Sequence, residues 1–95
     1  MKIKNEGNYI DVYDSVRSIA DAEMLIETIK KSKEKGADEI YIYIHDSKTL
    51  PSNIIGYLLK LANEGIEIKL FIKDRTLLEL VEFLCMSDQI EITNF

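Results

Sequence analysis

The chain has 95 residues, which is enough for one hydrophobic core and too few for two. Its 17 acidic and 12 basic residues give a net charge of −5, which argues against non-specific binding of nucleic acid. No apolar run approaches the length of a membrane span, and the first residues lack the apolar region of a signal peptide. The single cysteine cannot form an internal disulfide, so we expect a protein of the reducing cytoplasm.

The N-terminal residues predict a β-hairpin. Residues 2–4 are a candidate first strand, and in the polar turn that follows Gly7 can adopt a positive φ. Over residues 9–13, Ile10 and Val12 alternate with polar and aromatic side chains, which is typical of a strand with one buried face. We expect the first strand to form one edge of the sheet, antiparallel to the rest.

A first helix is predicted over residues 19–35. Ser18 is a candidate N-cap, and Asp21 three residues later resembles a capping box. The late turns are rich in lysine, but Glu34 interrupts the run, so we interpret it as a solvated helix surface rather than a polyanion site. Gly36 is suited to end the helix. The apolar positions expected to face the core are Ile19, Ala22, Leu25, Ile26 and Ile29.

A strand, a helix and another strand follow, joined by short links. β-Branched and aromatic residues alternate over residues 40–44, which predicts a strand. Apolar residues recur at helical spacing over residues 54–62, Gly65 ends that helix, and residues 66–72 alternate again. Such a βαβ unit is almost always right-handed. Ser52 lies where the loop becomes the helix, at the edge where such sheets bind their partners.

The last part of the chain predicts one more helix and one more strand. Thr76 and Glu79 form a capping-box pattern that would open the helix. Ser87 and Asp88 would end it, and residues 89–93 predict the final strand. The helix side chains expected to face inward are Leu77, Leu78, Val81, Leu84 and Cys85.

Together these elements predict an α/β fold in one domain, residues 1–95, built of repeated β-α units. We expect a mainly parallel sheet of four or five strands with an antiparallel N-terminal edge strand. Strands buried on both faces are usually apolar throughout, whereas these alternate, so the three helices should pack mainly on one face. The other face would be partly open and rich in aromatic side chains, namely Tyr9, Tyr13, Tyr41, Tyr43 and Phe71.

Patterns for catalysis or metal binding are absent from the sequence. It contains no glycine-rich phosphate-binding loop. We interpret Cys85 as a core residue, and His45 with Asp46 as a loop-capping pair rather than half of a metal site. The sequence therefore predicts a protein that is not an enzyme and needs no cofactor or metal.

Ser52 allows two interpretations, which are not exclusive. In the first, it is an N-cap whose hydroxyl accepts the amide hydrogen of Ile54 or Ile55. In the second, its hydroxyl takes a phosphoryl group. The helix N-terminus would favour that phosphate, which adds as much as about two negative charges at the edge of the sheet.

The order of motifs over residues 9–92 supports the second interpretation. An apolar strand (residues 40–44) is followed by a turn that opens a helix (residues 51–56), a glycine-bounded strand (residues 66–70) and a helix with a short apolar strand (residues 77–92). This arrangement resembles a STAS domain, the family of anti-sigma factor antagonists, whose turn has the form D-S-[ST]-G-L-G. The resemblance places Ser52 at the hydroxyl that a partner anti-sigma kinase phosphorylates.

The resemblance implies a protein-binding regulatory module without enzymatic activity. Such a module would dock on an anti-sigma factor, an ATP-binding protein of the serine kinase type, and phosphorylation of Ser52 would release it. No binding of nucleic acid and no insertion into a membrane are expected. The residues placed at the interface are Pro51, Ser52, Asn53, Ile54 and Tyr57.

Three residues depart from the family's turn and support a second hypothesis. Pro51 stands in place of the aspartate, Asn53 in place of the second hydroxyl residue, and Ile54 in place of the glycine. The chain would then be a constitutive structural or accessory subunit, for example of a lipid-transport ATPase, or a homodimer, without phosphoregulation. Its contact surface would be the aromatic sheet face, since aromatic residues are favoured in interfaces.

Overall fold

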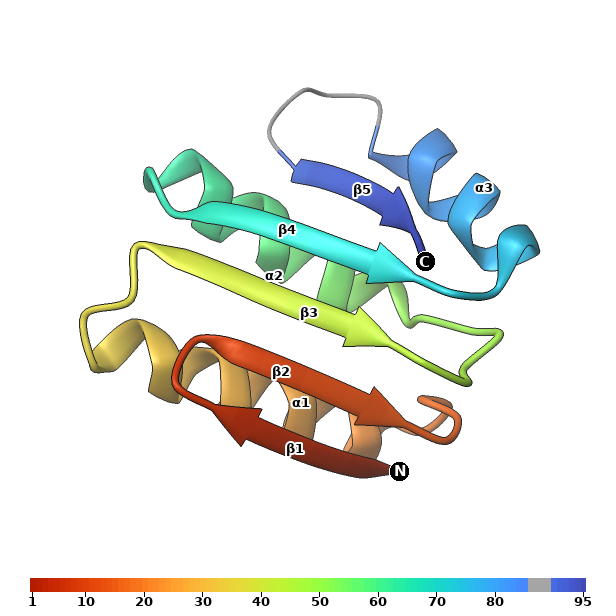
Figure 1. The fold of residues 1–95 in the computed structure, drawn as a ribbon, viewed down its shortest axis with the longest axis horizontal. Helices are drawn as coiled ribbons and strands as arrows, with labels where there is room; N and C mark the ends of the chain where they lie inside the picture. Colours follow the sequence, from red (N-terminus) through yellow and green to blue (C-terminus); the bar gives the residue numbers. More distant parts are fainter. Residues whose placement is uncertain (86–89) are drawn as a thin grey trace.

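The computed structural model of the chain describes residues 1–85 and 90–95. A five-stranded sheet and three helices account for most of these residues (Figure 1). The predicted helix end at Ser87 and Asp88, and the start of the last strand at Gln89, lie outside the described residues. In chain order the elements are β1 (Lys2–Glu6), β2 (Tyr9–Tyr13), α1 (Ile19–Glu34), β3 (Glu39–Ile44), α2 (Ser52–Asn63), β4 (Glu67–Ile72), α3 (Arg75–Leu84) and β5 (Ile90–Asn94).

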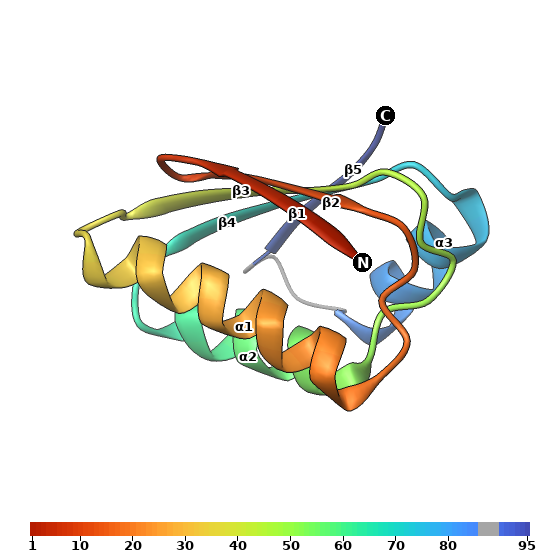
Figure 2. The same cartoon turned by 90° about the horizontal axis from the view of Figure 1, so that it is seen from below.

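The strands lie side by side in chain order, β1-β2-β3-β4-β5. β1 is antiparallel to β2, and the other neighbours are parallel. From β2 onward, each helix connects a strand to its next neighbour in the same direction along the sheet. When all these connections have the same handedness, their helices lie on the same side of the sheet. Figure 2 shows α1 and α2 beneath that side, with the opposite face uncovered. The predicted fold class is confirmed.

Alternation along the strands directs one row of apolar side chains toward the helices. Ile10 and Val12 of β2 are in register with Ile42 and Ile44 of β3, and all four are buried. The same row continues into β4 and packs against buried leucines and isoleucines of the helices, forming one core cluster. Each fully buried side chain of this size contributes about 1.5–3 kcal/mol to the stability of the folded state. The core therefore holds the strand ends, and the loops that follow them, in place.

Capping interactions determine where two of the helices begin. Ser18 is the N-cap of α1: its hydroxyl accepts the Asp21 N–H at 3.0 Å, and the Asp21 carboxylate accepts the Ser18 N–H at 3.4 Å. The predicted capping box is therefore confirmed. The predicted cap at Thr76 is wrong, because Asp74 comes earlier and its carboxylate accepts the Leu77 N–H at 2.9 Å.

Two apolar residues that were predicted to face the core are exposed. Ile19 in the first turn of α1 is 77% exposed, and Leu84 in the last turn of α3 is 48% exposed. Helical periodicity identifies the apolar side of a helix but not where the neighbouring elements end. The remaining predicted positions are buried or packed against the core: Ala22, Leu25, Ile26, Ile29, Leu77, Leu78, Val81 and Cys85.

Burial raises the pKa of the Cys85 thiol, as expected for a cysteine in a core.

Among residues 1–85 and 90–95, no helix has both the length and the apolar character needed to cross a bilayer.

Candidate functional site

Ser52 is the first residue of α2, at the edge of the sheet where the parallel strands end. Pro51 occupies the N-cap position, and its carbonyl oxygen accepts the Ile54 N–H at 3.1 Å. The prediction that Ser52 is the N-cap is therefore wrong, because the helix begins one residue earlier than that role requires. Ser52 is exposed, and its hydroxyl has no hydrogen-bond partner among the described residues.

Two other hydroxyl groups hold the loop that leads to Ser52. Ser47 is 1% exposed; its Oγ accepts the Val16 N–H at 3.0 Å and donates to the Thr49 carbonyl at 2.6 Å. Thr49 Oγ1 donates to the Val16 carbonyl at 2.8 Å. These bonds join the loop after β3 to the loop after β2, so the start of α2 is fixed relative to the start of α1. Sequence reasoning missed this contact, because the partners lie far apart in the chain.

A further hydrogen bond joins the same two loops at their surface. Asp14 has a φ of 67°, in the left-handed region that non-glycine residues seldom occupy. Its backbone N–H donates to Asp46 Oδ2 at 3.2 Å. Asp46 thus has the loop-capping role that was predicted for it together with His45, whereas His45 contacts the open face of the sheet.

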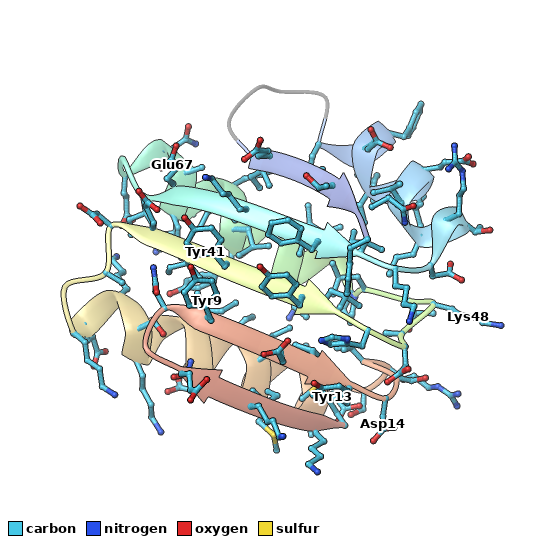
Figure 3. The ribbon with its side chains drawn as sticks, viewed as in Figure 1. Tyr9, Tyr13, Asp14, Tyr41, Lys48 and Glu67 are labelled. Atoms are coloured by element: carbon cyan, nitrogen blue, oxygen red, sulfur yellow. The ribbon has the colours of Figure 1, made fainter. Side chains whose placement is uncertain are left out.

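A hollow of about 370 Å³ lies beside this turn, between the two loops and α3. Arg17 and Lys48 contribute cationic side chains to its lining, and neither forms an ion pair with a carboxylate of the described residues. Lys48 extends away from the edge of the sheet in Figure 3. The apolar part of the lining includes Pro51 and the exposed Leu80 of α3. An apolar surface with unpaired cations beside it suits an acidic partner.

The other residues predicted to contact a partner fall into two groups. Asn53 is exposed next to Ser52, and Pro51 is half-buried. Ile54 is 1% exposed, so its side chain belongs to the core and is not available to a partner. Tyr57 is half-buried one turn further along α2 and packs against the core, and this burial raises the pKa of its hydroxyl. The accessible part of the predicted interface is therefore the turn itself.

The open face of the sheet carries the predicted aromatic residues. Tyr9 stacks on Tyr41 with ring centroids 4.7 Å apart, and Tyr43 stacks on Phe71 at 4.4 Å. Tyr9, Tyr13 and Tyr41 lie on the face turned toward the viewer in Figure 3. Stacking between neighbouring strands uses the flat faces of the rings and leaves their edges outward.

His45 belongs to this aromatic surface. Its ring stacks on Tyr13 at 4.4 Å, and its Nε2 lies 2.8 Å from Asp11 Oδ1. Phe95 meets the His45 ring edge-on at 5.2 Å. Tyr41, which stacks on Tyr9, donates to the Glu39 carboxylate at 2.6 Å, and this bond raises the pKa of Tyr41. Asp11, His45 and Tyr41 on this face thus already have polar partners.

Within the part of the chain that the structure describes, no group of three histidine, cysteine or acidic side chains could hold a metal ion. A scan against protein-family models, a search of curated proteins and a search of solved structures each found no match to the chain.

Proposed function

We propose that this protein is a non-enzymatic binding module that docks on a partner protein through the Ser52 turn and the hollow beside it. The observation that carries the proposal is the free hydroxyl of Ser52, exposed at the start of α2 and next to a hollow with two unpaired cations. Its resemblance to anti-sigma factor antagonists suggests an ATP-binding serine kinase as the partner.

Phosphorylation of Ser52 would act as the release signal. In the free protein, the α2 N-terminus stabilises a phosphate at this position. In the complex, the negative charge of the phosphate would be buried against the partner. Burying it costs roughly several kcal/mol when the partner offers no positive charge to pair with it. The phosphorylated form therefore favours the free state.

Phosphotransfer tests this proposal. The wild type, Ser52→Ala and Ser18→Ala are incubated with ATP and an anti-sigma serine kinase, and each is then weighed by mass spectrometry. Ser18 is the matched control because it is also an exposed serine at a helix start. We expect one phosphate on the wild type and on Ser18→Ala, and none on Ser52→Ala. Absence of phosphate on the wild type, or phosphate on Ser47 or Thr49, would reject the proposal.

A second candidate function is that of a constitutive subunit or homodimer that uses the aromatic sheet face. Tyr9 and Phe95 on this face are exposed, and β1 lies beside the face rather than over it. An exposed apolar patch of this kind is uncommon on a monomer. Light scattering at micromolar concentration tests the homodimer: a dimer that Tyr9→Lys dissociates supports it, and a strict monomer eliminates it.

A further inference from the structure

β1 is an edge strand with a free outer side. It pairs with β2 on one side, and the sheet order places no strand of the described residues on the other. Every second residue of an edge strand turns its N–H and C=O outward without a partner. β1 has five residues, and none of them is a proline that would prevent pairing. Its outer side can therefore accept another extended chain.

A groove runs along this edge, between β1 and α1. Its volume is about 300 Å³, and Ile3 and Met24 supply apolar side chains to its lining. Figure 2 looks onto this edge, with β1 above α1. Ser32 closes one part of the groove: its Oγ accepts from Asn5 Nδ2 at 3.4 Å and donates to the Gly7 carbonyl at 3.3 Å. An edge strand beside a helix, with a groove between them, is the geometry in which a peptide can join a sheet as a strand.

Four lysines flank the groove. Lys31 and Lys35 of α1 line it, and Lys2 and Lys4 lie on the open-face side of β1. None of these four ammonium groups is in an ion pair with a carboxylate of residues 1–85 or 90–95. Glu6 is the single acid of β1, at its far end. The edge is therefore complementary to an acidic chain.

We propose that β1 and this groove bind an extended acidic peptide segment of a partner protein, which joins the sheet as a further strand. Successive side chains of such a strand point to opposite faces. Its apolar side chains would enter the groove onto Ile3 and Met24, and its acidic side chains would lie opposite Lys2 and Lys4 on the other face.

The lysines also favour an acidic chain over a second copy of this chain as the occupant. An antiparallel pair of β1 strands centred on Lys4 would place the two Lys4 side chains opposite each other, and like charges on neighbouring strands destabilise a sheet. In that pair only Lys2 would meet an acid, Glu6, whereas an acidic peptide can place an acid opposite both lysines. Lysines on an edge strand are a known way to prevent such self-association. The site is separate from the Ser52 turn and does not depend on the proposed function.

Fluorescence anisotropy with labelled synthetic peptides tests the proposal on the intact protein. The probe alternates valine and glutamate. The control peptides replace glutamate by lysine, or replace the central residue by proline, which removes a backbone N–H. We expect the acidic peptide to bind at least about tenfold more tightly than either control, and added salt to weaken it. In NMR spectra, the largest amide shifts should fall on residues 2–6 and on the face of α1 beside them.

Variants on two similarly exposed residues locate the site. Met24 in the groove is 54% exposed and Leu80 in the other hollow is 51% exposed, so neither substitution removes a core side chain. We expect Met24→Asp to weaken the acidic peptide about tenfold or more and Leu80→Asp to leave it unchanged. The double variant Lys31→Glu, Lys35→Glu tests the charge of the groove alone, since both lysines are exposed. It should also weaken binding of the acidic peptide.

The proposal would be overturned if the acidic peptide did not bind, or if the acidic and lysine peptides bound equally well. It would also be overturned if the wild type and all groove variants bound the acidic peptide equally. A fourth contrary result would be a single-stranded oligonucleotide that binds more tightly than the peptide and loses this binding in the groove variants. The last result would make the groove a polyanion site instead.

Discussion

The loops after β2 and β3 both lead into a helix at the same edge of the sheet, yet they use their hydroxyl groups differently. In the first, Ser18 caps α1 and its hydroxyl is bound to the Asp21 N–H. In the second, Ser52 follows the cap position, which Pro51 holds, and its hydroxyl is free of partners in the described part of the chain. The difference separates a serine that the fold requires from a serine that is available for function.

The buried Ser47 extends this comparison, because it links the two loops. Ser47→Ala leaves the buried Val16 N–H without an acceptor, which costs about 1–3 kcal/mol. We therefore expect the largest loss of unfolding free energy for this variant, measured by urea denaturation. Lys48→Ala, an exposed neighbour in the same loop, is the control and should be close to neutral. If both variants were equally stable, the link between the loops would not matter for folding.

Ser18→Ala removes the cap of α1. Loss of an N-cap hydroxyl costs about 1 kcal/mol. We expect a lower urea midpoint for this variant, and a Ser18→Asn variant should recover most of the difference because asparagine is an equally good cap. A Ser18→Ala variant as stable as the wild type would contradict the role of this hydroxyl.

Asp21 completes the same cap and makes it sensitive to pH. The Arg17 N–H, at 3.3 Å from the carboxylate, and the Ser18 N–H lower the pKa of Asp21 in the folded state. The stabilisation is therefore fully present above the ordinary aspartate pKa, about 4, and is lost as the pH falls through the lowered value. We expect Asp21→Asn to be less stable than the wild type at neutral pH, with the difference shrinking below about pH 4. A difference that stayed constant with pH would exclude this contribution of the carboxylate.

Ser52→Ala should have the smallest effect on stability. The hydroxyl makes no capping bond and is exposed, so the change should lie within about 0.5 kcal/mol of the wild type. A loss as large as that of Ser18→Ala would mean that Ser52 has a structural role after all. The comparison between the two helix starts would then fail.

The sequence predicted the sheet well, because alternation depends on neighbouring residues alone. The strand at residues 9–13 was predicted with its observed limits, and β1, the antiparallel edge strand, is longer than predicted. Coverage of mainly one face followed from the same alternation. Ile19 and Leu84 were predicted wrongly because their burial depends on how far the next element extends.

The candidate site was harder to predict, because its geometry comes from contacts between distant loops. The cap at Ser18 was found from a local pattern, but Ser52 was misplaced because Pro51 holds the cap position without any side-chain bond. The bonds from Ser47 and Thr49 to Val16 leave no local pattern in the sequence. Ile54 was placed at an interface by family resemblance, whereas helical spacing alone already put it among the apolar positions that face the core.

Calorimetric titration of an anti-sigma serine kinase, loaded with a non-hydrolysable ATP analogue so that Ser52 is not phosphorylated, into wild type, Ser52→Ala and Ser52→Asp tests the central proposal most directly. We expect Ser52→Ala to bind like the wild type and Ser52→Asp to bind at least about tenfold more weakly, because only the second places a charge in the interface. Equal affinities for Ser52→Ala and Ser52→Asp would contradict docking through this turn.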